Sequence, residues 1–316
     1  MLATYLEQGA VSLRQTALPS IAPGFALLKL RLAGICNTDL ELQRGYYGFS
    51  GIPGHEFVAE VVECADASWI GKRIVGEINL ACGQCSWCDR DLGRHCPNRT
   101  VLGIVKHPGA FAEYLSLPVE NLHAVPEDMP DEVAVFTEPV AAASAILEQV
   151  SISPGTPVAV LGDGKLGLLC AMVLALHGAQ VSLYGRHPEK TAIAARMGVV
   201  PREASEAGDT QYPIVVEATG NADAMATAIR MTEARGKIIM KSTTHLPVSV
   251  DMASVIVPEI SLIGSRCGRF SDALPLLAAG MLPVREMIHA EYHLHEAPAA
   301  FERAAQKGTL KVLLRP

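Results

Sequence analysis

The sequence predicts an α/β protein of two domains, in which a doubly wound parallel-sheet domain is inserted near the end of a β-rich domain. Three observations support this prediction. Short alternating segments broken by Gly and Pro fill the first part of the chain, strands and helices then alternate regularly, and the tail returns to β-like segments. We therefore expect residues 1–145 and 286–316 to form the β-rich domain and residues 146–285 to form the parallel-sheet domain.

The composition is that of a packed globular protein. With 316 residues, 49% hydrophobic and 19% charged, the chain can bury two cores and is not of a disordered type. The formal net charge of −7 argues against nucleic acid or an anionic membrane as a general partner. The segment Met1–Glu7 lacks the basic start and apolar run of a signal peptide, and no stretch has the length of a membrane span. We expect a soluble, cytoplasmic protein.

In the β-rich part, residues 26–33 and 57–63 alternate between apolar and polar side chains, which predicts one strand in each segment. Residues 133–150 are rich in Ala and contain neither Gly nor Pro after Pro139, which predicts a helix. Because this helix follows the last β-like segment, we expect the boundary with the second domain to lie within it.

The parallel-sheet domain begins with a fully apolar run at residues 158–161, as expected for a strand covered on both faces. The segments that follow alternate between strand and helix, which predicts an open parallel sheet with helices on both faces. Further strands are expected at residues 180–184, 214–218, 237–240 and 261–264, and helices at residues 166–177, 189–197, 222–232 and 272–279. The tail is expected to add a β-like segment at 286–295, a short helix at 298–306 and a strand at 310–314.

Four cysteines gather in one loop, namely Cys82, Cys85, Cys88 and Cys96. A tetrahedral structural zinc site needs four thiolates that converge on one point, and it leaves no coordination position open. The alternative is a pair of disulfides, but disulfides are rare in reducing cytosol and nothing here suggests export. The spacing therefore predicts a structural zinc site that braces the fold, and we expect the chemistry elsewhere.

Gly162, Gly164 and Gly167 form a G-x-G-x-x-G motif that directly follows a predicted strand and opens a predicted helix. In that context the first glycine allows a tight turn, the second lets the backbone approach a pyrophosphate, and the third lets the helix pack on the strand. The start of the helix offers unpaired N–H groups to the anion. The alternative is a purely structural turn. The motif predicts the binding of a dinucleotide cofactor.

We expect the cofactor to be NADP(H) in preference to NAD(H). A carboxylate that binds the ribose 2′-hydroxyl should end the second strand, about 20 residues after the motif. No carboxylate stands there in the sequence, because the slot is filled by Gly185. Gly185 removes a repulsion against a 2′-phosphate, and Arg186, with His187 and Lys190 nearby, is suited to pair with that phosphate. The alternative is that Arg186 is merely solvated.

Three further fragments carry groups that bind metals. Cys36 lies at a predicted strand-to-turn junction and is followed by the hydroxyl of Thr38, while His55 and Glu56 stand at the start of a strand. Glu138 lies in the first turn of the Ala-rich helix. Each has an ordinary explanation as well. A lone His is often a polar residue whose hydrogen bonds are made within the protein, and Glu138 could simply interact with the dipole at the N-terminus of the helix. Periodicity alone does not show that they meet in space.

With these fragments the chain resembles the zinc-dependent alcohol dehydrogenases of the medium-chain dehydrogenase/reductase superfamily, in their polyol and sugar dehydrogenase branch. The resemblance covers nearly the whole chain and rests on residues 34–39, 54–56 and 137–139, the four-cysteine loop and the glycine turn. It implies a GroES-like catalytic domain plus a Rossmann domain for the cofactor, two zinc ions per chain, and a homodimer or homotetramer.

The resemblance implies a catalytic zinc bound by Cys36 and His55, with Glu56 beside it as a ligand or an exchanging partner. Relatives with a second cysteine ligand carry that cysteine near position 138, where this chain has Glu138. The third ligand is therefore open between Glu56 and Glu138, bound directly or through water.

The same resemblance implies that Thr38 is the first hydroxyl of a proton relay and that Asp39 orients His55. Where several relatives have a relay histidine this chain has Glu41, so the proton path is defined only as far as Thr38. The residues that match cofactor-lining positions are Lys165, Leu166, Thr219, Ser242, Ser265 and Arg266, with Lys311 near the coenzyme phosphates.

The reaction implied is reversible hydride transfer between an alcohol and NAD(P), in which zinc acts as a Lewis acid towards the substrate oxygen. The branch suggests a polyol or sugar-type secondary alcohol as the small-molecule substrate. Two alternatives are a zinc-independent enone or quinone reductase, whose known members lack the Cys36, His55 and Glu138 set, and a non-catalytic nucleotide-binding redox sensor.

Overall fold

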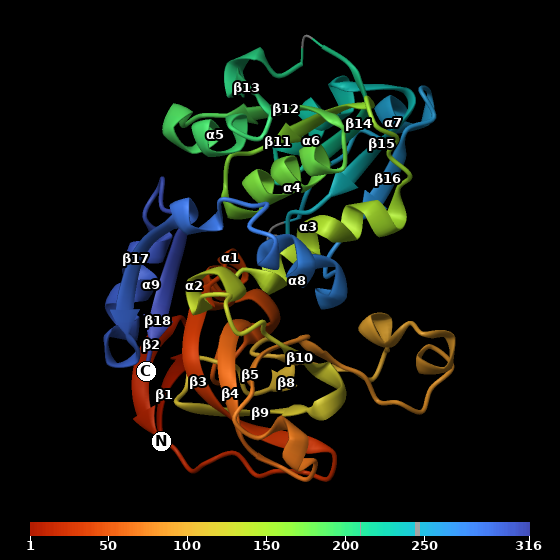
Figure 1. Ribbon diagram of the computed structural model, residues 1–316. Coiled ribbons are helices and arrows are strands. Elements are labelled where there is room, and N and C mark those ends of the chain that lie inside the picture. The colour runs from red at the N-terminus through yellow and green to blue at the C-terminus, as the bar shows by residue number, and fades with distance from the viewer. Residues whose placement is uncertain (209, 244–246) are drawn as a thin grey trace. The chain divides into compact units, whose positions relative to one another are not determined.

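The computed structural model describes residues 1–208, 210–243 and 247–316. It divides into two compact units (Figure 1). The β-rich unit comprises Met1–Glu138 and Phe270–Pro316, and the parallel-sheet unit comprises Pro139–Arg269. Residues 139–145 belong to the parallel-sheet unit and residues 270–285 to the β-rich unit, the reverse of the expected division. The α/β class and the inserted parallel sheet agree with the sequence prediction.

A seven-stranded sheet is the framework of the β-rich unit, in the order β10-β5-β4-β3-β18-β17 with β9 also paired to β3. Its central strand β3 (Phe25–Ile35) pairs antiparallel with β4 (Glu56–Cys64) and β18 (Lys311–Arg315). The blue C-terminal strand therefore lies beside the red-orange β3 (Figure 1). The strands predicted at residues 26–33 and 57–63 are confirmed.

The other strands of this unit form the edges of that sheet and two small sheets, β1-β2 and β6-β7-β8. Their bounds are β1 (Leu2–Glu7), β2 (Ala10–Gln15), β5 (Arg73–Gly76), β6 (Asn79–Leu80), β7 (Thr100–Leu102), β8 (Lys106–His107), β9 (Tyr114–Pro118), β10 (Leu122–Ala124) and β17 (Ile288–His293). Its helices are α1 (Asn37–Gln43), α2 (Asp131–Ala134), α8 (Phe270–Ala278) and α9 (Ala297–Ala305).

The parallel-sheet unit contains a six-stranded sheet in the order β13-β12-β11-β14-β15-β16, with every neighbouring pair parallel. The strands are β11 (Pro157–Leu161), β12 (Gln180–Gly185), β13 (Val200–Glu203), β14 (Tyr212–Glu217), β15 (Thr232–Met240) and β16 (Ser261–Gly264). The helices are α4 (Lys165–Leu176), α5 (Pro188–Ala195), α6 (Ala224–Arg230) and α7 (Ala253–Ile256). The strand order reverses at β11, which is where a doubly wound sheet binds its ligand.

Strand β11 is buried on both faces, as its apolar run predicts. Ala159 and Leu161 belong to a core cluster with residues of α6 and α7, while Val158 and Val160 on the alternate face are also fully covered. The helix predicted at residues 133–150 is divided, because α3 (Thr137–Gln149) begins only at Thr137. Pro139 explains the break, since a proline ring clashes with the carbonyl four residues earlier and is tolerated only in a first turn.

Among the described residues, no helix combines the length and the apolar character that crossing a membrane requires.

Candidate functional site

Three metal-binding side chains that are far apart in the sequence meet in the β-rich unit. Cys36 follows β3 and caps the start of α1, and His55 and Glu56 stand at the start of β4. Because β3 and β4 run antiparallel with Gly34 opposite Glu56, the end of one strand lies next to the beginning of the other. The donor atoms of Cys36, His55 and Glu56 all lie within 4.8 Å of one another. His55 and Glu56 are buried, at 3% and 1% exposure.

Gly54 is needed to place His55. Its φ of +102° lies in the left-handed region, and a Cβ at this position would be only 2.4 Å from the ring of Phe111. The same ring packs edge-on against Phe301 with 5.9 Å between the ring centroids. The backbone before His55 is therefore fixed by close contact with the core of the unit.

Asp39 ties the cluster together from α1. Its Oδ2 accepts the backbone N–H of Cys36 at 2.8 Å, and its Oδ1 accepts that of Gly54 at 3.2 Å. The Nδ1 of His55 lies 3.3 Å from Oδ1 and, within the described residues, has no well-formed hydrogen bond. Burial alone would lower the pKa of His55, but the negative charges of Asp39 and Cys36 raise that pKa well above 6.5. Asp39 thus faces the ring of His55.

Thr38 lies in the first turn of α1 beside the thiol of Cys36, with 3.8 Å between Oγ1 and Sγ. Its hydroxyl therefore lies next to one of the three grouped metal-binding donors. Glu41, three residues further on, is buried at 7% exposure and accepts a 2.6 Å hydrogen bond from Arg44. Glu41 is therefore a buried carboxylate that is held by the guanidinium of Arg44.

Glu56 has a charged partner that the sequence did not indicate. The ammonium of Lys311, on β18, donates a hydrogen bond to Oε2 of Glu56, and both side chains are 1% exposed. The ammonium also lies 5.5 Å from the ring centroid of Phe136. Gly34 makes room for the pair, because a Cβ there would be 2.8 Å from Oε2 of Glu56. The ammonium expected near the coenzyme phosphates is thus engaged inside the β-rich unit.

Glu138 is not among the donors that all lie within 4.8 Å of one another. It lies in the first turn of α3 and is half-buried, and the described metal-binding group in this region consists of Cys36, His55 and Glu56 alone. The structure therefore groups Glu56, and not Glu138, with the cysteine and the histidine.

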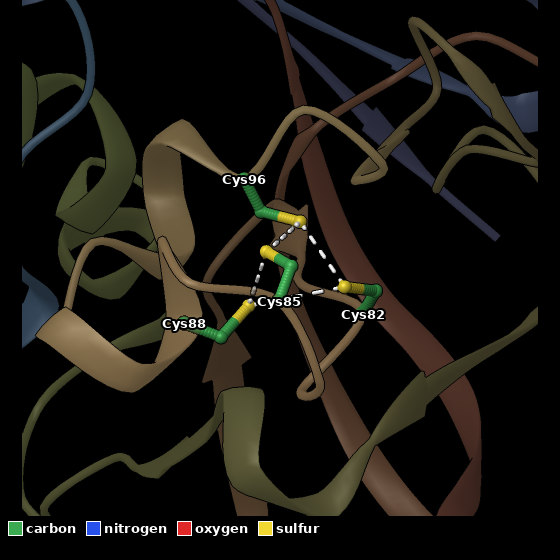
Figure 2. Close-up of side chains that lie close together, drawn as sticks. All are labelled: Cys82, Cys85, Cys88 and Cys96. Atoms are coloured by element: carbon green, nitrogen blue, oxygen red, sulfur yellow. Dashed lines mark hydrogen bonds between the residues drawn. The ribbon is translucent and has the colours of Figure 1, made fainter.

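The four-cysteine loop closes as the spacing predicts. Figure 2 shows the thiols of Cys82, Cys85, Cys88 and Cys96 pointing towards one another. Four of the sulfur–sulfur separations are 3.5, 3.5, 3.7 and 4.0 Å. A tetrahedron with metal–sulfur bonds of about 2.3 Å has edges of about 3.8 Å. All eight cysteines, every one of them in the described residues, are free thiols. The loop fits a zinc ion and contains no disulfide.

The glycine turn after β11 has the geometry of a nucleotide-binding turn. Gly162 has a φ of +107°, and a Cβ there would be 2.8 Å from the carbonyl oxygen of Ala218. A Cβ at Gly167 would be 2.0 Å from the carbonyl oxygen of Gly162, so the first turn of α4 packs directly on the loop. A Cβ at Gly164 meets nothing within 4 Å, which leaves its backbone open to a ligand. The first and third glycines are needed for packing, and the second faces open space.

A carboxylate does stand at the end of β12, although the sequence shows none there. Asp163, from the glycine turn, reaches across to this strand, and its Oδ2 accepts the backbone N–H groups of Arg186 and His187. The sequence prediction does not include Asp163, because a ribose-binding carboxylate is expected at the end of the strand and not in the glycine turn. An acidic residue between the first two glycines of the motif is the signal that could have found it.

Lys165 and Leu166 begin α4, directly after the second glycine of the turn. The cofactor candidates Thr219, Ser242, Ser265 and Arg266 lie just beyond the carboxyl ends of β14, β15 and β16. The hydroxyl of Ser242 accepts the N–H of Gly220 at 2.8 Å, and both Thr219 donors bond to Glu217. The loops are held by a buried lysine that follows β15. Lys241 is 5% exposed and donates to the carbonyl oxygen of Ala142, the hydroxyl of Ser265 and the carbonyl oxygen of Arg266. The structure thus brings these candidates to one edge of the sheet.

Comparison with known protein families agrees with this architecture. Residues 22–127 match the alcohol dehydrogenase GroES-like domain family. Residues 166–279 match the zinc-binding dehydrogenase family. The first match lies in the β-rich unit and covers Cys36, His55 and the cysteine loop, and the second begins within the glycine turn of the parallel-sheet unit.

Individual relatives cover most of the chain. An L-threonine 3-dehydrogenase from Chelativorans sp. is 33% identical over 80% of this chain and 79% of its own length. A sorbitol dehydrogenase from Halalkalibacterium halodurans is 28% identical over 92% of this chain and 91% of its own length. The solved structure of a zinc-binding dehydrogenase from Sinorhizobium meliloti bound to NADP superposes with a TM-score of 0.90 and 28% identity, covering 100% of this chain and 99% of that one.

Proposed function

The chain belongs to the zinc-dependent alcohol dehydrogenases of the medium-chain dehydrogenase/reductase superfamily, and on that premise we propose how its residues perform the reaction. The protein is an NAD(P)-dependent alcohol dehydrogenase, which transfers hydride between an alcohol carbon and a nicotinamide. One observation carries the assignment of its site: the donor atoms of Cys36, His55 and Glu56 lie within 4.8 Å of one another.

We assign the catalytic zinc to this cluster. A thiolate, an imidazole and a carboxylate form a three-ligand set of the kind that leaves one zinc position for a substrate. Zinc bound there supplies Lewis-acid chemistry that lowers the pKa of an alcohol hydroxyl. Glu56 is the preferred third ligand, because its donor atom lies within 4.8 Å of those of Cys36 and His55. Lys311 compensates the buried carboxylate of Glu56.

The neighbouring residues orient the ligands and move the proton. Asp39 faces Nδ1 of His55, which leaves the other ring nitrogen for a metal, and it also fixes the backbone of Cys36. Thr38, whose hydroxyl lies beside Cys36, receives the substrate proton at Oγ1 and passes it outward. A second zinc would be held by Cys82, Cys85, Cys88 and Cys96 of the cysteine loop, where four thiolates leave no position for a substrate.

The substrate proposed is a polyol or another polar secondary alcohol. The support is that the relatives include a sorbitol dehydrogenase and an L-threonine 3-dehydrogenase, so both a polyol and a hydroxy amino acid belong in the assay. The cofactor proposed is a nicotinamide dinucleotide. The NADP-bound relative favours NADP(H). The carboxylate of Asp163, which lies at the end of β12, favours NAD(H).

We further propose a homodimer, with a homotetramer as the larger alternative. Strand β16 is an edge of the six-stranded sheet, and in the described residues it pairs with β15 alone. Exposed apolar side chains precede it in the sequence at Met252, Ile256 and Val257, which are 53%, 66% and 82% exposed. Analytical ultracentrifugation distinguishes these states. A cytoplasmic location is proposed as well, supported by the eight free cysteines.

The test of the function is an oxidation panel of simple alcohols, polyols and L-threonine with NAD⁺ and with NADP⁺, read at the nicotinamide absorbance, together with metal analysis. We expect turnover with at least one polar alcohol and two zinc ions per chain. One zinc per chain with reduction of an enone or quinone would favour the zinc-independent alternative. Nucleotide binding with no turnover on any substrate would favour the redox-sensor alternative.

A further inference from the structure

The side chain of Asp163 occupies the end of β12 in the parallel-sheet unit. Three donors converge on its Oδ2: the N–H of Arg186 at 2.8 Å, the N–H of His187 at 2.7 Å and the Nδ1 of His187 at 2.9 Å. All three belong to the turn that follows the strand. Because Asp163 is itself part of the glycine turn, one carboxylate links the two loops that a dinucleotide-binding sheet uses for the pyrophosphate and the ribose.

Gly185 is required by Asp163, and not by a ligand. A Cβ at position 185 would be 2.7 Å from the Cβ of Asp163, 2.8 Å from its Oδ2 and 2.8 Å from Cγ2 of Thr191. Real Cβ atoms do not approach neighbours that closely. The absence of an acidic residue at 185 therefore follows from lack of space. It does not mean that the strand end lacks a negative charge, because the charge arrives from the glycine turn.

The carboxylate of Asp163 is ionised and keeps one oxygen available. Burial would raise its pKa, but the hydrogen bonds from the ring and N–H of His187 and from the N–H of Arg186 lower it below 3.8. All three donors reach Oδ2, and within the described part of the chain no hydrogen bond to Oδ1 is formed. The side chain is 12% exposed, so Oδ1 can accept a hydrogen bond from a ligand hydroxyl.

The groups that would receive a 2′-phosphate are mostly occupied. Among the three cations expected to pair with it, His187 is engaged with Asp163 and Lys190 is only 5% exposed, which leaves Arg186 as the exposed one. The two backbone N–H groups of the turn are already bonded to Asp163. A cavity of about 190 Å³ adjoins this strand end, lined by Gly185, Pro188, Thr191, Pro201, Arg202, Glu203 and Glu206. The charged side chains of this lining are two carboxylates and one guanidinium, which does not favour a phosphate.

We propose that Asp163 is the residue that reads the ribose 2′ position, and that it makes the site select NAD(H) over NADP(H). Oδ1 accepts a hydrogen bond from the 2′-hydroxyl of NAD(H), and the same charge repels the 2′-phosphate of NADP(H). Asp163 thus takes the role that a residue at position 185 has in other dinucleotide-binding sheets. The proposal rests on the proposed function only in requiring that this unit binds a nicotinamide dinucleotide.

The test is direct binding of NADH and NADPH, measured by calorimetry on the full zinc-loaded chain, so that no substrate is needed. We expect the wild type to bind NADH about ten-fold or more tightly than NADPH. Asp163→Asn and Asp163→Ser should each reduce that ratio by about ten-fold, mainly by weakening NADH. Glu189→Gln is the matched control, because it removes an exposed carboxylate from the first turn of α5, and it should leave the ratio unchanged.

A relocation variant separates the role of the charge from damage to the loop. Asp163→Gly combined with Gly185→Asp and Thr191→Ser moves the carboxylate to the strand end and removes the atoms that crowd a Cβ there. This triple variant should regain the preference for NADH that Asp163→Gly alone loses. A wild type that binds NADPH more tightly, or a ratio unaffected by Asp163→Asn, would overturn the proposal while leaving the dehydrogenase function intact. Binding of neither nucleotide by the wild type would overturn both.

Discussion

The ammonium of Lys311 and the carboxylate of Glu56 form an ion pair that is buried to 1% exposure on both sides, between the last strand of the chain and the start of β4. The two residues are 255 positions apart in the sequence. A buried carboxylate without a partner is strongly unfavourable, so Lys311 allows an acidic residue to stand beside Cys36 and His55. The C-terminal strand thereby contributes to the metal-binding cluster although it has no metal-binding side chain of its own.

Replacement of this lysine should destabilise the β-rich unit. Lys311→Met leaves the carboxylate of Glu56 buried and uncompensated, and we expect the free energy of unfolding to fall by about 3–5 kcal/mol. Thermal and urea unfolding of the zinc-stripped proteins measure the effect, because zinc bound by Glu56 would itself compensate the carboxylate. Lys307→Met removes an exposed lysine from the same tail and should change the stability little. A loss in Lys311→Met no larger than in Lys307→Met would show that the pair is not formed in solution.

Replacement of one cysteine in each cluster should separate the two zinc sites. Cys88→Ser breaks the four-thiol set, so we expect one zinc per chain and a large loss of thermal stability. Cys36→Ser should also leave one zinc but abolish alcohol turnover, with nicotinamide binding retained because that cluster lies in the other unit. Cys64→Ser, at the far end of β4, is the control for both. Normal zinc-dependent turnover in Cys36→Ser would remove the assignment of the catalytic site.

Much of the fold follows from local patterns, and the site follows only in part. The glycine turn could be predicted because a buried strand, three glycines and a helix are contiguous, and the cysteine loop because its ligands are near neighbours in the sequence. Strands as short as β6 and β8 gave no usable periodicity. The roles of Asp163 and Lys311 were missed for another reason. Their partners are set by which side chains share space across a sheet, as the crowding at Gly185 and Gly34 shows.

The glycine before His55 offers a test of how the core positions the site. Gly54→Ala has to accommodate both a left-handed backbone and a contact of 2.4 Å with the ring of Phe111. Gly45→Ala has nearly the same φ, +103°, but its Cβ meets nothing within 4 Å. We expect Gly45→Ala to cost about 1–2 kcal/mol of stability with normal turnover. Gly54→Ala should cost about 1–3 kcal/mol more and lower kcat, because His55 is displaced.

Comparing urea unfolding and turnover in the two variants separates backbone strain from overpacking. Equal stability losses together with equal activity would contradict the role given to the contact with Phe111. Loss of zinc from Gly54→Ala but not from Gly45→Ala would support it further, since His55 is assigned as a ligand of the catalytic zinc.

Glu77 should make the stability of the β-rich unit decrease at acidic pH. Its Oε1 accepts the N–H of Phe270, where α8 begins, at 3.1 Å and lies 3.4 Å from Nε2 of His123. Burial would raise the pKa of Glu77, but the hydrogen bonds from His123 and Phe270 and the charges of His123 and Arg94 lower it below 4.5. The stabilisation is therefore complete above pH 4.5 and is lost as the pH falls through the lowered pKa of the folded state.

The measurement is the free energy of unfolding of the wild type and Glu77→Gln at a series of pH values from neutral into the acid range. We expect Glu77→Gln to be less stable by about 2 kcal/mol at neutral pH. The difference should shrink towards low pH, because protonation removes the same charge from the wild type. Glu120→Gln, which changes an exposed carboxylate of the same unit, should show no such trend. A difference that stays constant across the whole range would mean that the charge of Glu77 does not hold the start of α8.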